Sequence, residues 1–208
     1  IFIFIKICYC HVSELKTVRN QNAIEGEIVM PLITPLKKDE APAEVREKLE
    51  GIEEAFGMLP NAAGVLANSN CSLDMSMKME EALSQGELNE TQREMIALAV
   101  SQANECRYCV SAHTEFGAGL GLDTADIIKS RLCEADNPKD QAMLDLAIAI
   151  VENKGDVAED QIANARENGL NDCLIIEVVS NVVNIIFGNY VNHLAKTDID
   201  FPVCKMDL

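Results

Sequence analysis

The strongest constraint on the fold is a helical spacing of apolar residues that runs from Pro42 almost to the end of the chain. Val45, Leu49, Ile52 and Phe56 recur at spacings of three and four, which places them on one face of a helix. Later segments repeat this spacing. No run of alternating strand residues and no glycine-rich phosphate loop interrupts them. The sequence therefore predicts an all-α fold.

Capping residues mark where the helices start. Asn89, with Gln92 three residues later, predicts the start of a nearly apolar helix that runs to about Ala103 and should be buried. The last helix is apolar on most of its faces, which predicts burial within the subunit or between subunits. Further helix starts are expected at Asn61, Asn104, Asp123, Asn137 with Pro138, and Asn171.

Composition excludes several classes of function. A hydrophobic share of 48% and a charged share of 25% are typical of a globular chain. A formal net charge of −17 disfavours binding to nucleic acids and to anionic membrane surfaces. Most of the eight cysteines stand alone in apolar helical patterns, which favours free thiols in a reducing compartment. We therefore expect a cytoplasmic protein.

The first 40 residues differ from the rest of the chain. The apolar run over residues 1–10 is too short to span a bilayer, and it lacks the basic start and cleavage site of a signal peptide. Residues 1–40 are therefore interpreted as a leader or extended arm, or in part as an artefact of the gene model. The helical domain is expected over residues 41–208.

A cluster of reactive side chains lies in the middle of the chain. At helical spacing, Cys106, Cys109 and His113 share one face near the start of a helix. The positive end of the helix lowers the pKa of a thiol there, and an imidazole one turn from Cys109 can take its proton. A carboxylate from the preceding helix can orient that imidazole, and Glu94 is the candidate.

This layout resembles a known family. The residues concerned are Arg93-Glu94, Cys106-Arg107-Tyr108-Cys109, His113-Thr114, Asn189-Tyr190-Val191-Asn192-His193 and Asp198-Ile199-Asp200-Phe201-Pro202. They are similar to the alkylhydroperoxidase D-like (AhpD-like), carboxymuconolactone decarboxylase superfamily, and in detail to its peroxidase-related branch. The resemblance covers residues 30–203.

The resemblance implies an AhpD-like helical bundle that assembles as a homotrimer or homohexamer. It also implies a thiol-dependent peroxidase, in which Cys109 attacks the peroxide and Cys106 resolves the sulfenic acid to a disulfide. His113 is then the base and Glu94 its partner. No bound cofactor is implied. The reductant is an external dithiol, which in some members of the superfamily is carried by a lipoylated protein.

Two accessory positions are also candidates. Tyr108 stands where the founding peroxidase has a second histidine. A tyrosine there can donate a hydrogen bond but carries protons poorly near neutral pH, because its ordinary pKa is about 10. His193, at the end of the last helix, could line the site or a subunit interface.

Other functions for the cysteine pair remain open. The pair could serve a redox-sensing or structural oligomer without turnover, or the chain could be a carboxymuconolactone decarboxylase-like enzyme, although decarboxylase members lack paired cysteines. Zinc would need about four ligands, and Cys106, Cys109 and His113 supply three, so no metal is expected. Four cysteines that stand alone are interpreted as core thiols: Cys71, Cys133, Cys173 and Cys204.

Overall fold

The computed structural model describes residues 30–208, and within them the chain is helical without β-strands. The first 29 residues, which include most of the predicted leader, lie outside the described residues. The all-α prediction is confirmed. The elements are the 3₁₀ helix η1 (Lys38–Glu40) and helices α1 (Ala43–Phe56), α2 (Asn61–Leu66), α3 (Asn70–Leu83), α4 (Glu90–Ala103), α5 (Arg107–Gly119), α6 (Thr124–Arg131), α7 (Pro138–Asn153), α8 (Glu159–Glu167) and α9 (Asp172–Ala195).

The segment before α1 is attached to the helices by backbone hydrogen bonds. The amide of Leu32 donates to the carbonyl of Ala195 at the end of α9 (2.7 Å), and the amide of Leu36 donates to the carbonyl of Gly64 in α2 (2.8 Å). Gly64 permits this close approach, because a Cβ at that position would lie 2.8 Å from the Cβ of Pro35. The described part of the predicted arm thus runs along α2 and the end of α9.

Most helices begin at the capping residues that the sequence predicted. Asn89 and Gln92 form a reciprocal capping box, and Asn171 caps α9 through its side chain. Asp123 and Asn137 cap α6 and α7 in the same way. Two starts differ by one or two residues: the N-cap of α2 is Pro60, and Asn104 ends α4 while Cys106 caps α5.

Helix α4 is the centre of the fold. It packs against α5, α6, α7 and α9, and its residues from Met95 to Ser101 are all buried, as the apolar run predicted. Ile96, Leu98 and Val100 have no exposed surface. Aliphatic side chains of α7 and α9 complete this core, which provides most of the driving force for folding. The helix that carries Glu94 is therefore held firmly in place.

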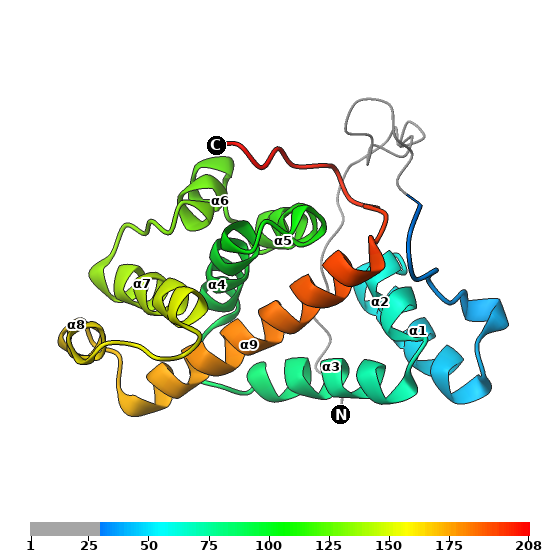
Figure 1. Ribbon diagram of the computed structural model, residues 1–208, viewed down its shortest axis with the longest axis horizontal. Helices are drawn as coiled ribbons and strands as arrows, with labels where there is room; N and C mark the ends of the chain where they lie inside the picture. The colour runs from blue at the N-terminus through cyan, green and yellow to red at the C-terminus, as the bar shows by residue number, and fades with distance from the viewer. Residues whose placement is uncertain (1–29) are drawn as a thin grey trace.

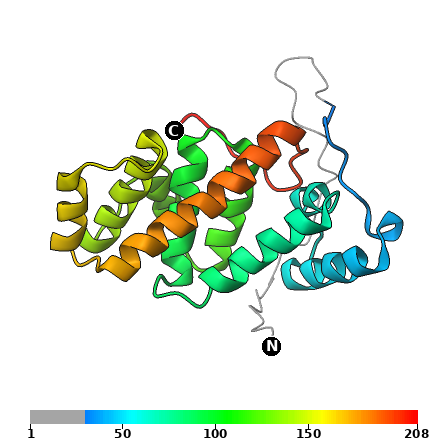
Figure 2. The same cartoon turned by 60° about the horizontal axis from the view of Figure 1, so that its bottom comes forward.

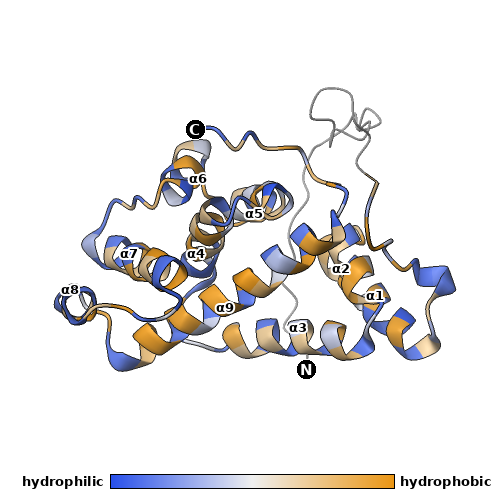
Figure 3. Ribbon diagram, viewed as in Figure 1, coloured by the Kyte–Doolittle hydropathy of each residue, from blue (hydrophilic) through white to orange (hydrophobic). Residues whose placement is uncertain are grey.

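Helix α9 crosses the molecule diagonally, with α1–α3 on one side and α4–α8 on the other (Figure 1), and the tilted view keeps this arrangement (Figure 2). It is 24 residues long and apolar enough to span a membrane by length and composition alone. Figure 3 shows that α9 is rich in hydrophobic residues (orange), and within the described chain one apolar face of this helix stays exposed. The exposed apolar side chains of α9 are Ile176, Val179, Val183, Tyr190 and Leu194.

Candidate active site

The two central cysteines form a disulfide at the start of α5. Their Cα atoms lie 5.3 Å apart, and the amide of Cys109 donates to the sulfur of Cys106 at 3.4 Å. A tight turn leads into this helix, because Glu105 adopts a left-handed backbone (φ 56°) and the amide of Cys106 donates to the carbonyl of Ser101 (2.9 Å). The sulfurs thus lie at the positive end of a helix, which stabilises a thiolate.

His113 and Glu94 are brought together across α4 and α5. Nδ1 of His113 lies 2.7 Å from Oε1 of Glu94, and their side chains are 20% and 13% exposed. This contact holds the ring in one orientation and leaves Nε2 free of Glu94. No direct hydrogen bond joins His113 to Cys109 among the contacts of the described residues, in which Cys109 is oxidised.

The electrostatics of His113 favour its charged form. Burial acts to lower the pKa of His113, but the negative charge of Glu94 and its hydrogen bond raise it, and Glu80 adds to this. The balance raises the pKa above the ordinary value of 6.5. The ring of His113 is therefore a stronger proton acceptor than an ordinary histidine.

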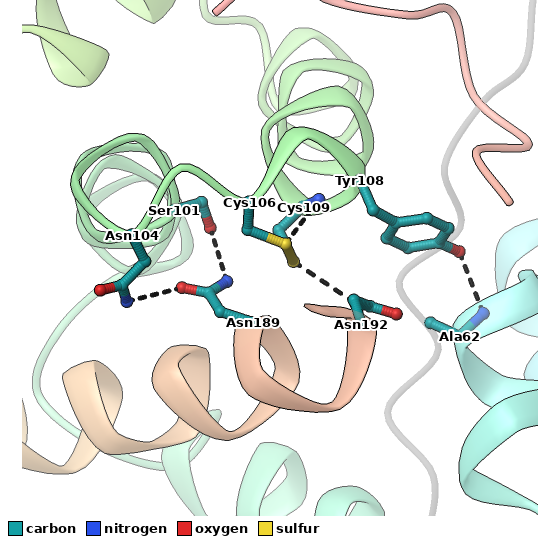
Figure 4. The surroundings of a disulfide bond; sticks show 8 residues. All are labelled: Ala62, Ser101, Asn104, Cys106, Tyr108, Cys109, Asn189 and Asn192. Carbon is teal, nitrogen blue, oxygen red and sulfur yellow. Dashed lines mark hydrogen bonds between the residues drawn. A yellow bond between two sulfur atoms is a disulfide. The ribbon is translucent and has the colours of Figure 1, made fainter. Parts of the chain in front are cut away.

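Helix α9 contributes a residue that sequence reasoning did not assign a role. Nδ2 of Asn192 donates to the sulfur of Cys109 at 3.4 Å, and Figure 4 shows this contact beside the disulfide. One turn earlier, Nδ2 of Asn189 donates to Oγ of Ser101 (3.2 Å), and Oδ1 of Asn189 accepts from Asn104 (2.8 Å). These contacts fasten the end of α9 to the turn that carries the cysteines.

Tyr108 points away from the disulfide. Its hydroxyl accepts a hydrogen bond from the amide of Ala62 at 3.1 Å (Figure 4). Burial raises the pKa of Tyr108 strongly, and the carboxylate of Asp200 raises it further. Asp200 itself is held by the amide of Asn61 (2.6 Å). Tyr108 therefore joins α5 to α2 and to the C-terminal segment as a neutral hydroxyl.

Apolar side chains surround the disulfide on the other sides. Phe201 packs edge-on against Tyr108, with ring centroids 5.8 Å apart, and against Phe116 at 5.6 Å. The ring of His113 also meets Phe116 edge-on, at 5.7 Å. Met58 packs against the same cluster. These contacts make a largely apolar environment for the sulfurs.

The remaining candidates lie elsewhere. His193 is exposed on α9, while its neighbour Asn192 reaches the sulfur. Cys71 and Cys173 are exposed, so their interpretation as core thiols is wrong. Their positions near the starts of α3 and α9 leave them on the outer faces of those helices.

Cys133 and Cys204 are half-buried. Cys133 lines a cavity of about 450 Å³ between α7 and α8, and burial raises the pKa of its thiol to about 11. Across residues 30–208, no group of three or more His, Cys, Asp or Glu side chains is arranged to hold a metal ion.

Comparison with known proteins supports the resemblance at the site. Residues 73–132 match the model of the carboxymuconolactone decarboxylase family, and this segment contains Glu94, Cys106, Cys109 and His113. The uncharacterized protein YdfG of Bacillus subtilis (strain 168) is 31% identical over 78 residues, which are 36% of this chain and 53% of that protein. The match thus spans about half the length of this curated relative.

Solved structures share the fold over most of the chain. An uncharacterized peroxidase-related protein from Silicibacter sp. TM1040 has a TM-score of 0.73 and 24% identity, covering 82% of this chain and 94% of that one. An AhpD-core, peroxidase-related protein from Ralstonia eutropha JMP134 has a TM-score of 0.74 and 21% identity, covering 84% and 94%. The debrominase Bmp8, solved with 2,3,4-tribromopyrrole, has a TM-score of 0.72 and 17% identity, with the same coverage.

The solved structures thus show that the chain has the AhpD-like fold, and the segment that carries the cysteines, residues 73–132, is similar to the carboxymuconolactone decarboxylase family.

Proposed function

We propose that this protein is a thiol-dependent peroxidase that cycles between a Cys106/Cys109 dithiol and a disulfide. The observation that carries this proposal is the pairing of two cysteines at a helix N-terminus with an adjacent His113–Glu94 pair. A thiolate needs positive potential and a proton acceptor nearby. The N-terminus of α5 provides the potential, and the imidazole of His113 is the acceptor.

The proposed cycle has three steps. The Cys109 thiolate attacks the terminal oxygen of a hydroperoxide, so an S–O bond forms, the O–O bond breaks and an alkoxide leaves with the electron pair. The alkoxide takes a proton and becomes an alcohol. The thiol of Cys106 then attacks the sulfenic acid of Cys109, forming the disulfide and releasing water. An external dithiol reduces the disulfide by thiol exchange and is itself oxidised.

His113 and Glu94 serve the first step. His113 lies one turn after Cys109, so when the pair is reduced its ring can accept the thiol proton and later pass it to the alkoxide. Glu94 fixes Nδ1 of that ring through the 2.7 Å contact. The raised pKa of His113 suits this exchange, because the protonated ring must persist until the leaving group forms.

The apolar shell favours an organic hydroperoxide over hydrogen peroxide. Met58, Phe116 and Phe201 contact the cysteine cluster and would pack against an alkyl or aryl group. No resident cofactor takes part in the cycle. The reductant is a small or lipoyl-type dithiol, and the compartment is the cytoplasm, where such reductants keep thiols reduced.

We further propose assembly as a homotrimer or homohexamer. The exposed apolar face of α9, which includes Ile176, Val183 and Leu194, supports this arrangement, because such a face gains from burial against another copy. The side chain of His193, on the same helix, would then lie near the contact between subunits.

Hydroperoxide consumption with a panel of dithiols tests this function. The wild-type protein should consume cumene hydroperoxide with at least one dithiol. Cys109→Ser should lose this activity, and Cys173→Ser, which changes an exposed cysteine, should keep it. Unchanged consumption by Cys109→Ser would refute the assignment. Activity on a cyclic carboxylic acid that survives the loss of both thiols would instead indicate decarboxylase-like chemistry.

A redox switch is the second candidate. Cys106 has no exposed surface and Cys109 is 5% exposed, so a bulky reductant has little access to either sulfur in the described state. A switch would form the disulfide reversibly with oxidants and show no multiple turnover with any dithiol. The same assay distinguishes the two functions, because a peroxidase consumes many equivalents of peroxide per subunit.

A further inference from the structure

The side-chain amide of Asn192 contacts the sulfur of Cys109 through its nitrogen, and its oxygen has no hydrogen-bond donor among the described residues. Its Nδ2 donates to the sulfur at 3.4 Å, and the residue is 8% exposed. Its Oδ1 is buried and accepts no hydrogen bond from the described part of the chain. Figure 4 shows this oxygen directed away from the sulfur. A buried acceptor without a donor is costly, which points to a ligand that completes it.

The backbone around Asn192 is rigid. Its carbonyl accepts from the amides of Lys196 and Thr197, which close the end of α9. Asn189, one turn earlier, already joins α9 to α4 and has both ends of its amide satisfied. The side chain of Asn192 is therefore not needed for that attachment, and it is held at a fixed distance from the reacting sulfur.

We propose that Asn192 contacts both reactants of the peroxidase step: its amide N–H holds the sulfur of Cys109, and its amide oxygen accepts the O–H of the hydroperoxide. This inference rests on the proposed function. A hydroperoxide carries one O–H donor, which matches the unused acceptor. The oxygen that bears this hydrogen is the one the thiolate attacks, so one amide aligns both atoms.

The chemistry of the step assigns each half of the amide a separate effect. The N–H contact becomes charge-assisted when Cys109 is a thiolate and stabilises that form. The carbonyl contact holds the terminal oxygen while the S–O bond forms and the O–O bond breaks. The departing alkoxide takes its proton from His113, so the proton on the attacked oxygen stays and becomes part of the sulfenic acid.

The test separates these effects in a Cys106→Ser background, which keeps Cys109 as a thiol and leaves a serine, a good N-cap residue, at the start of α5. Asn192→Ala and Asn192→Asp both remove the N–H donor, and the second keeps the shape of the side chain. The matched control is Asn181→Ala. Asn181 is also buried on α9, and its side-chain amide donates to the carbonyl of Glu177. It lies about three helical turns before Asn192, away from the sulfur.

Two rates are measured across pH: alkylation of Cys109 by iodoacetamide, and oxidation of Cys109 by cumene hydroperoxide. At neutral pH both Asn192 variants should be alkylated about tenfold more slowly than the control, which corresponds to a thiol pKa raised by about one unit. At high pH, where all proteins are thiolates, alkylation should become equal. Oxidation of Asn192→Ala should remain about tenfold slower there, because its acceptor for the peroxide is missing.

The outcomes separate the inference from the function it rests on. If wild type and control react with hydroperoxide and both Asn192 variants match them at every pH, the inference is overturned and the proposed function stands. If no protein reacts with hydroperoxide, the proposed function and the peroxide contact both fail. A shifted alkylation profile in that case supports the sulfur contact alone.

Discussion

Replacing Glu94 with glutamine should lower the pKa of His113 while keeping its geometry. The amide oxygen of glutamine can still accept from Nδ1, so the loss is that of the negative charge. A charge-assisted hydrogen bond is about twice as strong as a neutral one, and the two side chains are only 20% and 13% exposed. We therefore expect this contact to lose about 1–2 kcal/mol and the pKa of His113 to fall.

Proton NMR measures this directly, because the chain has three histidines and their ring signals can be assigned by substitution. The matched control is Glu90→Gln, which changes an exposed glutamate in the first turn of the same helix. An unchanged titration of His113 in Glu94→Gln would refute the reasoning. The rate of peroxide reduction depends on the proton of His113, so the pH at which this rate changes should also be lower in the variant than in the wild type.

Folding stability gives a second readout with a defined sign. Because the pKa of His113 in the folded protein is raised above 6.5, the charged pair stabilises the fold fully below that pH. The contribution is lost as pH rises through the folded-state value. Urea unfolding of wild type and Glu94→Gln should therefore differ most in mildly acidic solution and converge at higher pH. A difference that grows with pH would contradict this account.

Three further changes test the fold and the surroundings of the site. Ile96→Ala should lower the free energy of unfolding by about 3 kcal/mol, since this side chain is fully buried in α4, and urea unfolding checks it. Asn89→Ala should cost about 1 kcal/mol in the same assay, because it breaks the capping box with Gln92. Asp200→Ala should also cost about 1 kcal/mol in this assay, because it removes the acceptor for the amide of Asn61, and an unchanged free energy of unfolding would contradict this.

Local chemistry allowed much of the fold to be predicted from the sequence. Side-chain caps such as Asn89 and Asn171 act within three residues, so the helix starts can be predicted from adjacent residues in the sequence. Glu94 and His113 are 19 positions apart, but they lie on consecutive helices joined by a short turn. Two such helices usually pack side by side, so the pairing was also within reach of sequence reasoning.

The role of Asn192 was harder to predict, because its contact with Cys109 spans 83 positions and depends on how α9 packs. The sequence drew attention to the imidazole of His193 rather than to the neutral amide beside it. The helical spacing of the buried residues in α9 could have identified Asn192. Val178, Val182, Asn189 and Asn192 are buried on a common side of α9, while His193 falls outside that face.

The exposure of Cys71 and Cys173 shows a second limit. A cysteine is usually buried, and this tendency led to their interpretation as core thiols. Both stand in the first turn of a helix, where the apolar face is not yet established by neighbouring residues. Their exposure makes them useful as internal controls, because nonspecific oxidation should reach them before the buried pair.

The most direct test of the account is a single oxidation of the fully reduced protein by one equivalent of cumene hydroperoxide, followed by peptide mass mapping. The account predicts a Cys106–Cys109 disulfide in wild type and, in Cys106→Ser, a sulfenic acid on Cys109 that is trapped by dimedone. Oxidation confined to the exposed Cys71 and Cys173, with Cys109 left as a thiol, would contradict it.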